Sequence, residues 1–530
     1  MATTALLEDH QCPWVQEAQL WRERAERAEQ EQCESKARIA QLEELVIKIV
    51  GELDVLKRRN FGQSSEKVER EIKKRQKPPL DPQKIQEKRR KNRASRLEFE
   101  EVKVPIPVPA EQRHCDHCGR EREPMGPGKT STVFEYVPAK LIRVVHIRET
   151  LTCPCCEGSI VTAPPPPKVI EKGEYGPALI ANTLVEKCLD ALPLYRQAKR
   201  YRRLGLPLSR STLCDLFHQA AALLRPIWLR LKALVALQWL VQADETTLNV
   251  VTKGIEGSRR AFIWAFLAWL ETGELLVVVV FSPSRSGETP REVLGASTGC
   301  LIVDAYTGYN AVCTLEGRDR GGCWAHVRRK FFDALTNAEP PARVMLALIF
   351  EIYLVEHEAC EQRITGSEAH LALRKDRSAK AVEKIKEFVA SERPKHTPKS
   401  PMGNALGYVE NQWESLTLFL TDARIPIDNN ASERVMKLVA LGRKNYLFVG
   451  NDTAGEDLAV VLTLVTCCES LGINPQDYLA DVLLKVSQLP SERLGELLPQ
   501  NWKAAKEKEK QRQAALERAI TPIGISINHR

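Results

Sequence analysis

The stretch "QWLVQADETTLNVV" (238–251) decides the fold, because it sets a carboxylate inside an otherwise apolar, strand-like run. The segments "RAFIWAFLAWL" (260–270) and "GELLVVVVFSP" (273–283) have the apolar and β-branched composition of two further strands. A fourth, buried strand that ends in Asp304 is expected in "GCLIVDAYTGYN" (299–310), and "GGCWAHVRRKFFDAL" (321–335) is expected to be a short strand running into a helix. Three strands followed by a strand–helix alternation predict a mixed α/β sheet.

Two aspartates stand out in these strands. Asp244 lies within the first strand, and Asp304 directly follows an apolar run. Carboxylates rarely lie inside apolar strands unless they are paired or coordinate a metal. Taken singly, each has a simpler interpretation as an aspartate that caps the turn after a strand.

A third acid, Glu433, lies in "IPIDNNASERVMKLVALGRKNYLF" (425–448), near the start of an amphipathic helix. With Asn430 as the N-cap, Glu433 has the spacing of a capping box, which is the structural alternative. As a set, Asp244, Asp304 and Glu433 fit a site for two divalent cations about 3.5–4 Å apart. Magnesium prefers such oxygen ligands and leaves room for phosphate.

Length and composition bound the rest of the chain. Its 530 residues predict two to four domains, and its 43% hydrophobic content is typical of a globular protein. No apolar run is long enough to span a bilayer, and the N-terminus lacks the pattern of a secretory signal. Fifteen scattered cysteines without an export signal indicate a reducing cytosol, with clustered cysteines bound to metal. The net charge of +8 is concentrated locally, which points weakly toward nucleic acid.

Residues 1–66 are expected to be a helical, coiled-coil region. Apolar residues recur at heptad a and d positions, namely Ile39, Leu42, Val46, Ile49, Leu53 and Leu56. The alternative is one amphipathic helix that packs on its own domain. Residues 67–101 form a basic linker, which is either solvated or an arm that lies on phosphates.

Residues 102–162 carry the clearest spacing signal, the pairs "CDHC" and "CPCC". Cys115, Cys118, Cys153 and Cys156 are predicted to bind one structural zinc ion tetrahedrally, although Cys155 is an alternative to Cys156. A strand-rich interval of 34 residues would bring the two pairs together as a hairpin. A redox-active cysteine pair is the competing interpretation.

Residues 163–238 combine a Pro-rich connector with helices. A basic helix ending near Gly205 is followed by a helix starting after Ser209 or Ser211, which is similar to a helix-turn-helix. An ordinary helical hairpin fits the same pattern.

The motifs "ADET", "DAYTGYN", "CWAHVRRKFFD" and "DNNASERVMKLVALGRKNYLFVG" resemble those of the insertion sequence 66 family of bacterial transposases. The resemblance extends to "RRNFGQSSEK" (58–67), the cysteine segment and "LPLYRQ" (192–197). It implies an N-terminal leucine zipper, a zinc-finger segment and a ribonuclease-H-like catalytic domain over 239–450. A helical insertion at about 333–420 would interrupt that domain, and 451–530 would form a C-terminal helical region with a charged tail.

The resemblance also implies chemistry. Asp244, Asp304 and Glu433 match the D-D-E triad, whose carboxylates bind two Mg²⁺ or Mn²⁺ ions in the family's scheme. The activity implied is metal-dependent cleavage of DNA at the element ends, followed by strand transfer into target DNA. His326 and Asp428 are auxiliary candidates at this site. The candidate DNA-binding residues are Arg328, Arg329, Arg434, Arg443 and Lys444.

Two other functions fit part of the sequence. A non-catalytic DNA-binding regulator with a coiled coil and a zinc module would leave the three acids unexplained. A metal nuclease of the same fold would cleave DNA without joining ends. The expected partners are the terminal inverted repeats of an element, target DNA, a second copy or more of the chain, and accessory proteins from the same element. No membrane partner is expected, and the expected location is the bacterial cytoplasm, at the nucleoid when DNA is bound.

Overall fold

The computed structural model describes residues 141–151, 161–251, 257–314 and 316–520. These residues all belong to one compact unit that starts at Ile72. The predicted coiled coil (1–66), the basic linker (67–101) and all four proposed zinc ligands lie outside the described residues. The first described strands, β1 (Thr150–Leu151) and β2 (Val161–Thr162), pair antiparallel.

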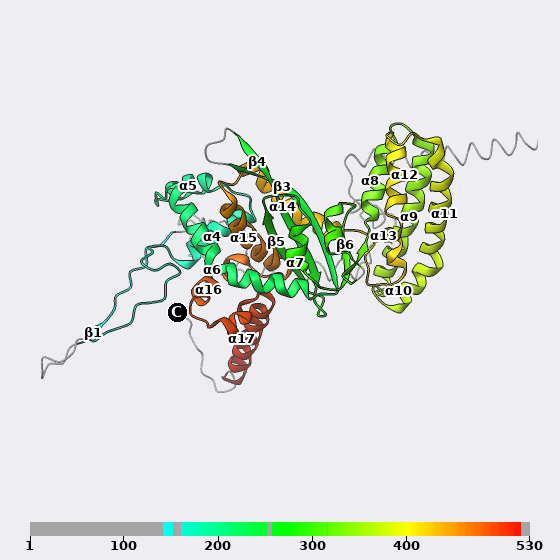
Figure 1. Ribbon diagram of the computed structural model, residues 1–530. Coiled ribbons are helices and arrows are strands. Elements are labelled where there is room, and N and C mark those ends of the chain that lie inside the picture. The colour runs from blue at the N-terminus through cyan, green and yellow to red at the C-terminus, as the bar shows by residue number, and fades with distance from the viewer. Residues whose placement is uncertain (1–140, 152–160, 252–256, 315, 521–530) are drawn as a thin grey trace, which may run out of the picture. The chain divides into compact units, whose positions relative to one another are not determined.

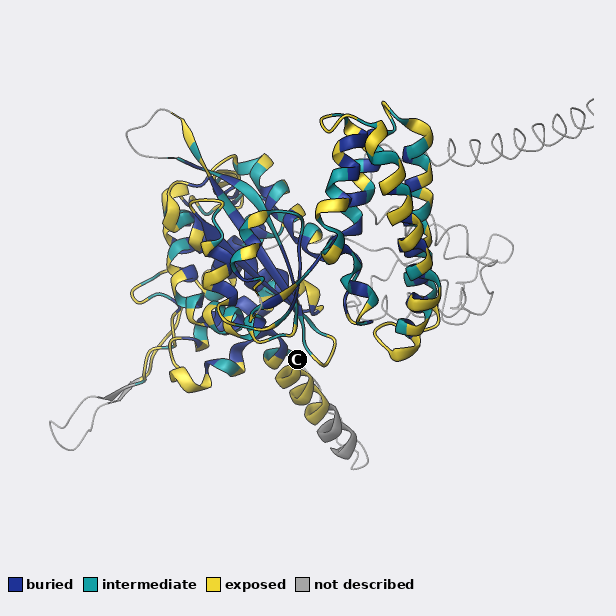
Figure 2. Ribbon diagram, turned by 45° about the vertical axis from the view of Figure 1, so that its right-hand side comes forward, coloured by how far each residue is buried: buried dark blue, intermediate teal, exposed yellow. Residues whose placement is uncertain are grey.

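A mixed five-stranded sheet forms the centre of the fold, as the strand pattern predicted (Figure 1). Its strands are β3 (Leu240–Val251), β4 (Ser258–Trp269), β5 (Leu275–Ser282), β6 (Gly299–Ile302) and β7 (Arg318–Gly321). They lie in the order β5-β4-β3-β6-β7. The first three pair antiparallel, and β6 and β7 add parallel to β3. Figure 2 shows these strands as the most continuously buried part of the molecule.

The fourth strand is shorter than expected. Strand β6 ends at Ile302, and Asp304 and the rest of the "DAYTGYN" motif leave the sheet. A 3₁₀ turn at Thr307–Ala311 and the helix α7 (Glu288–Leu294) lie on either side of this strand in the chain. The predicted end of this strand at Asp304 is therefore two residues too late, because Asp304 accepts a hydrogen bond from the Tyr306 N–H and turns the backbone.

Helix α15 (Asp452–Ser470) covers the free edge of β5 with side chains. Thr463 accepts from the Val279 N–H at 2.8 Å, and Cys467 Sγ accepts from the Val277 N–H at 3.3 Å. Three residues further along the helix, the Ser470 hydroxyl donates to the Leu275 carbonyl. One helix face thus satisfies the polar groups that an edge strand would otherwise leave open to another chain.

Three helices precede the sheet in the chain, namely α4 (Pro177–Cys188), α5 (Leu194–Arg203) and α6 (Arg210–Ala236). Two of them, α4 and α6, pack with α15. Helix α6 begins at the Ser209 cap, whose hydroxyl accepts from the Thr212 N–H. It contacts α15 and β5 and buries Leu224, Ile227 and Leu231. The two helices expected on either side of Gly205 are thus present as α5 and α6. Much of α6 packs in the core.

The interval between β7 and α14 (Asn430–Tyr446) is helical (Figure 1). It comprises α8 (Trp324–Ala334), α9 (Glu339–Glu361), α10 (Glu368–Leu373), a π-helical turn (Arg374–Ser378), α11 (Ala379–Glu392), α12 (Pro401–Asn411) and α13 (Trp413–Thr417). Helix α8 packs on α9 and α12, and the N–H of Trp324 donates to the Ile427 carbonyl. The chain ends in α16 (Pro475–Lys485) and α17 (Pro499–Ile520).

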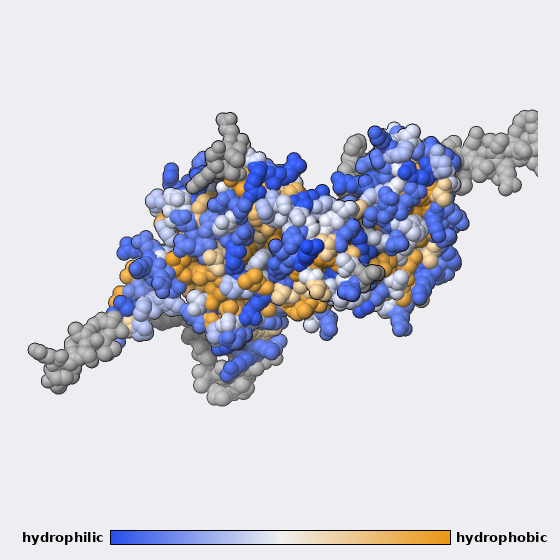
Figure 3. Space-filling model, in the orientation of Figure 1, coloured by the Kyte–Doolittle hydropathy of each residue, from blue (hydrophilic) through white to orange (hydrophobic). Residues whose placement is uncertain are grey.

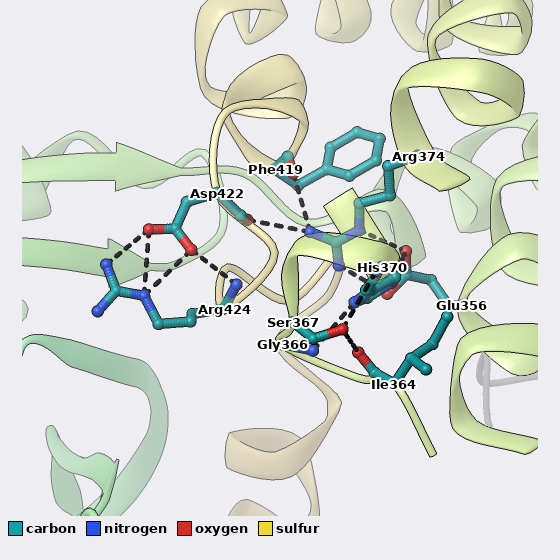
Figure 4. A network of polar contacts seen from close by, with 9 residues as sticks. All are labelled: Glu356, Ile364, Gly366, Ser367, His370, Arg374, Phe419, Asp422 and Arg424. Atoms are coloured by element: carbon teal, nitrogen blue, oxygen red, sulfur yellow. Dashed lines mark hydrogen bonds and ion pairs between the residues drawn. The ribbon is translucent and has the colours of Figure 1, made fainter. Parts of the chain in front are cut away.

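Two buried side chains, Arg374 and His370, and the partly buried Glu356 join these inserted helices (Figure 4). Arg374 binds both carboxylate oxygens of Glu356, each at 2.7 Å, and donates to the carbonyls of Phe419 and Asp422. His370 Nδ1 accepts from the Gly366 N–H, so Nε2 carries the proton and donates to Glu356 at 3.2 Å. The network connects α9, α10 and the chain that leads into α14.

Candidate active site

Strand register places the first two acids side by side. Strands β3 and β6 run parallel, with Gln242 opposite Ile302. Asp244 and Asp304 come two residues further along each chain, Asp304 just beyond the end of β6, and the two are close enough for the charge of Asp304 to raise the pKa of Asp244. Each carboxylate accepts a hydrogen bond that holds it locally. Asp244 accepts from the Glu245 N–H and Asp304 from the Tyr306 N–H, both at 2.9 Å.

Helix α14 brings Glu433 to the same region. Asn429, not Asn430, precedes the first helical residue, so Glu433 is the fourth residue of the helix and the capping-box spacing is not realised. The Asn429 side chain makes no cap, because its amide donates at 2.7 Å to the carbonyl of Ala243, next to Asp244. The Asn429 N–H donates to Cys323 Sγ at the start of α8. One fully buried asparagine therefore fixes the start of α14 against β3.

The acids repel one another. Burial first, and then the negative charges of Glu245, Asp304 and Glu433, raise the pKa of the Asp244 carboxyl to about 8. The hydrogen bond from the Glu245 N–H acts in the opposite direction but does not outweigh them. Burial and the neighbouring carboxylates thus disfavour the charged form of Asp244, which a bound cation would favour.

Of the two auxiliary candidates, His326 lies beside Glu433. His326 Nε2, on α8, is 3.9 Å from Glu433 Oε1, and its buried Nδ1 has no hydrogen-bond partner in the described part of the chain. Asp428 instead orders the entry to α14. Its carboxylate accepts from the Asn430 N–H at 3.2 Å, from the Asn430 side-chain amide at 2.7 Å and from the Tyr353 hydroxyl at 3.0 Å.

Sequence reasoning missed a second cluster, which is built around Glu245. This carboxylate is 2% exposed and binds Arg285 and the Tyr309 hydroxyl. Arg285 lies 3.9 Å above the ring of Tyr306, whose hydroxyl donates to the Arg285 carbonyl. The sequence feature that could have indicated this cluster is the pair of tyrosines in "DAYTGYN", which follow Asp304 closely. The cluster holds the loop after β5 against the loop that carries Asp304.

The predicted DNA-binding residues divide into two groups. The Arg443 guanidinium donates to the Thr247 carbonyl at 2.6 Å and to its hydroxyl at 2.5 Å, and so fastens α14 to β3. Burial lowers the pKa of Arg328, which is half-buried on α8. Arg329, Arg434 and Lys444 are exposed. The last three are the ones placed where a phosphate can reach them.

The donor set suits a divalent cation chemically, because it consists of carboxylate oxygens with uncompensated charge. As the side chains stand, the described residues contain no group of three or more His, Cys, Asp or Glu gathered closely enough to hold an ion. Glu433 is 37% exposed, and His326 at 3.9 Å is its one polar side-chain contact in the described ranges. Its side chain therefore has room to turn.

An α/β domain with acids from two adjacent strands and one helix, next to exposed arginines, has the composition of an enzyme that acts on a phosphate backbone. Comparison with known proteins gives the family. Residues 172–457, more than half of the chain, match the family described as "Transposase IS66 family". The chain belongs to this family, as the resemblance of its motifs predicted. Membership supports a transposase role with DNA as the partner.

A second family match covers the cysteine segment. Residues 112–157 match the "zinc-finger binding domain of transposase IS66", a range that includes all four predicted zinc ligands. This match supports zinc binding in that segment.

Similar proteins occur in Sinorhizobium fredii. "Uncharacterized protein y4jD" is 33% identical over 410 residues, which cover 75% of this chain and 80% of that protein. "Uncharacterized protein y4hP" is 31% identical over 418 residues, or 74% of each chain. "Uncharacterized protein y4qI" is 30% identical over 427 residues, or 78% of this chain and 77% of that protein. In the described ranges, no helix combines the length and apolar character needed to cross a membrane.

Proposed function

We propose that this transposase cleaves DNA at the ends of its element and joins the freed 3′ ends to target DNA, with Asp244, Asp304 and Glu433 as the catalytic acids. The observation that carries the proposal is the register of β3 and β6, which sets Asp244 beside Asp304. Glu433, delivered by α14, lies close enough to raise the pKa of Asp244. The strand order, with three antiparallel strands extended by two parallel ones, supports a ribonuclease-H-like domain.

In this proposal the acids act as ligands. Two Mg²⁺ or Mn²⁺ ions held by them would supply an activated nucleophile and stabilisation of the leaving oxygen. Asp244 and Asp304 are fixed by backbone hydrogen bonds on the sheet, which gives the rigid placement that positioning requires. Asn429 and Asp428 hold the start of α14, and His326 lies beside Glu433.

The remaining expectations stay within this proposal. The zipper region 1–66 is proposed to make a homodimer or larger oligomer, and accessory proteins from the same element are proposed as partners. Light scattering on the full chain and on a chain with Leu42 and Val46 replaced by Asp tests the zipper. A reduced mass for the variant is expected, and an unchanged mass would contradict the role.

The catalytic assignment is tested with Asp244→Asn, Asp304→Asn and Glu433→Gln in the full chain. Labelled duplexes that carry the element ends are incubated with Mg²⁺, and cleaved and joined products are separated on gels. Each variant should lose both products and keep its affinity for the duplex, because the acids bind metal and not DNA. Asp319→Asn is the matched control, since Asp319 is an exposed acid on β7 of the same sheet.

The outcomes separate the alternatives. A fully active Glu433→Gln protein would overturn the assignment of the third acid. Cleavage without joined product from the unaltered chain would favour a nuclease. Binding without cleavage under any divalent metal would favour a DNA-binding regulator.

A further inference from the structure

Helix α14 presents a charged face to solvent on the side away from β3. Val435, Met436 and Val439 are its buried residues next to the sheet. Lys437 and Lys444 are exposed, and they are seven residues apart, so they lie on one face two turns from each other. Glu433 is the one acid in the helix. This face therefore carries net positive charge from the catalytic region toward the C-terminal end of α14.

Helix α5 continues the positive surface. Its sequence, LYRQAKRYRR, contains no acid, and Arg196, Lys199 and Arg203 are exposed. Arg196 Nη1 donates to the Asn445 side chain at 3.3 Å, so α5 adjoins the end of α14. Figure 3 shows mainly hydrophilic residues over α5. We name the set of Lys437, Lys444, Arg196, Lys199 and Arg203 the basic track.

The charges of the basic track are not neutralised by neighbouring acids. Among the described residues, none of these five side chains forms an ion pair with a carboxylate, whereas Arg200 of the same helix pairs with Glu186. Elsewhere on the surface, cations commonly have partners, as in Lys380–Asp376 and Lys485–Asp481. An unpaired row of cations produces a positive potential that attracts a polyanion.

The dimensions suit duplex DNA. From Glu433 to Asn445 the helix advances about 18 Å at 1.5 Å per residue. Successive phosphates of one strand are spaced about 3.4 Å along the duplex axis, so this length matches about five nucleotides. The track begins at the helix that carries the third acid, which is where a backbone must pass to reach the site.

We propose that the basic track binds the phosphate backbone of duplex DNA, independently of sequence, and leads it to the catalytic region. The proposal deepens the proposed function and rests on it. It predicts contacts to phosphate and not to base edges, because the side chains are long cations on an open surface. The track is therefore expected to contribute to affinity and its salt dependence, but not to recognition of the element ends.

The test measures equilibrium binding of the full chain to a fluorescent duplex of unrelated sequence, without divalent metal, over a series of NaCl concentrations. The plot of log K against log [NaCl] has a negative slope. Lys437→Ala/Lys444→Ala should reduce the magnitude of this slope by about 1.8, since each lost phosphate contact removes about 0.9. The triple variant of Arg196, Lys199 and Arg203 to Ala should lower it by about 2.7 on the same basis. Affinity for element-end duplexes should fall by the same factor as for unrelated duplexes.

Two further variants keep the test decisive. Lys437→Arg/Lys444→Arg keeps the charges and should keep the slope. Lys384→Ala/Lys386→Ala removes two exposed lysines from α11, where Glu383 and Glu387 stand beside them, and should also keep the slope. If Lys437→Ala/Lys444→Ala has the same slope as the unaltered chain, the proposed role of the basic track is wrong. A loss confined to element-end duplexes overturns the sequence-independent reading.

Failure of this inference is distinct from failure of the proposed function. The slope is measured without metal and without turnover, so it does not depend on the catalytic acids. If Glu433→Gln is inactive while the track variants bind DNA normally, the catalytic role of the acids stands. The DNA-binding role of the basic track is then wrong.

Discussion

Replacing Arg374 by Met should loosen the helices inserted between β7 and α14. The Arg374 side chain is 1% exposed and its guanidinium makes hydrogen bonds to Glu356 and to the carbonyls of Phe419 and Asp422. Met fills much of the volume of the aliphatic stem but leaves the partly buried Glu356 carboxylate without its cation. Loss of one partner of a buried pair costs about 3–5 kcal/mol.

The assay is hydrogen exchange of the full chain, read peptide by peptide. A loss of about 3–5 kcal/mol corresponds to a roughly 10²–10⁴-fold larger opening constant, up to the limit set by global unfolding. The increase should appear in peptides from α9 and from the α10–α11 region. Peptides from α15 provide the internal reference, because that helix packs on β5 and has no contact with the network.

A second variant separates the charge from the packing. In Glu356→Gln/Arg374→Met no buried charge remains unpaired, so the double variant should be more stable than Arg374→Met alone by about 1–3 kcal/mol. Lys380→Ala is the matched control, since it breaks an exposed ion pair in the adjoining helix and should leave exchange unchanged. If Arg374→Met exchanges like the unaltered chain, or if the double variant is no better, the reasoning is refuted.

Three other predictions follow from the described contacts and the family match. Burial opposes the charged form of Glu356, but hydrogen bonds from His370 and Arg374 outweigh it and hold its pKa below the ordinary 4.5. Its stabilisation is therefore complete above pH 4.5 and lost as the pH falls through the folded value, so the difference in α9 exchange between Glu356→Gln and the unaltered chain should shrink below pH 4.5. Thr463→Val removes the acceptor for the Val279 N–H and should cost about 1–3 kcal/mol in denaturant unfolding, whereas equal stability would show that the edge is satisfied otherwise. Cys118→Ser should reduce the zinc content measured by atomic emission, and an unchanged content would remove Cys118 from the ligand set.

The sequence was most informative where a repeating pattern decides the local structure. The strands β3, β4 and β5 were predicted within a few residues, because apolar and β-branched residues dominate the runs of β4 and β5 and flank the polar centre of β3. The strand before "DAYTGYN" was predicted to end at Asp304, two residues too late, since the turn there depends on one hydrogen bond from the Tyr306 N–H to Asp304. The spacing of Asn430 and Glu433 also fitted a capping box. That box does not form, because the Asn429 side chain donates to the sheet and does not cap its own helix.

Residue types and their order were sufficient to select Asp244, Asp304 and Glu433 and to indicate the family, because unusual carboxylates and long motifs are visible in one dimension. Only the tertiary structure decided how these residues meet. The parallel pairing of β6 with β3 sets two acids side by side, and the Asn429 amide on the Ala243 carbonyl sets the start of α14. The tertiary structure also separated Arg443, whose guanidinium is bound to Thr247, from Lys444, which is exposed. Strand register and side-chain partners arise from contacts between residues some 60 to 250 positions apart, and no local pattern encodes such contacts.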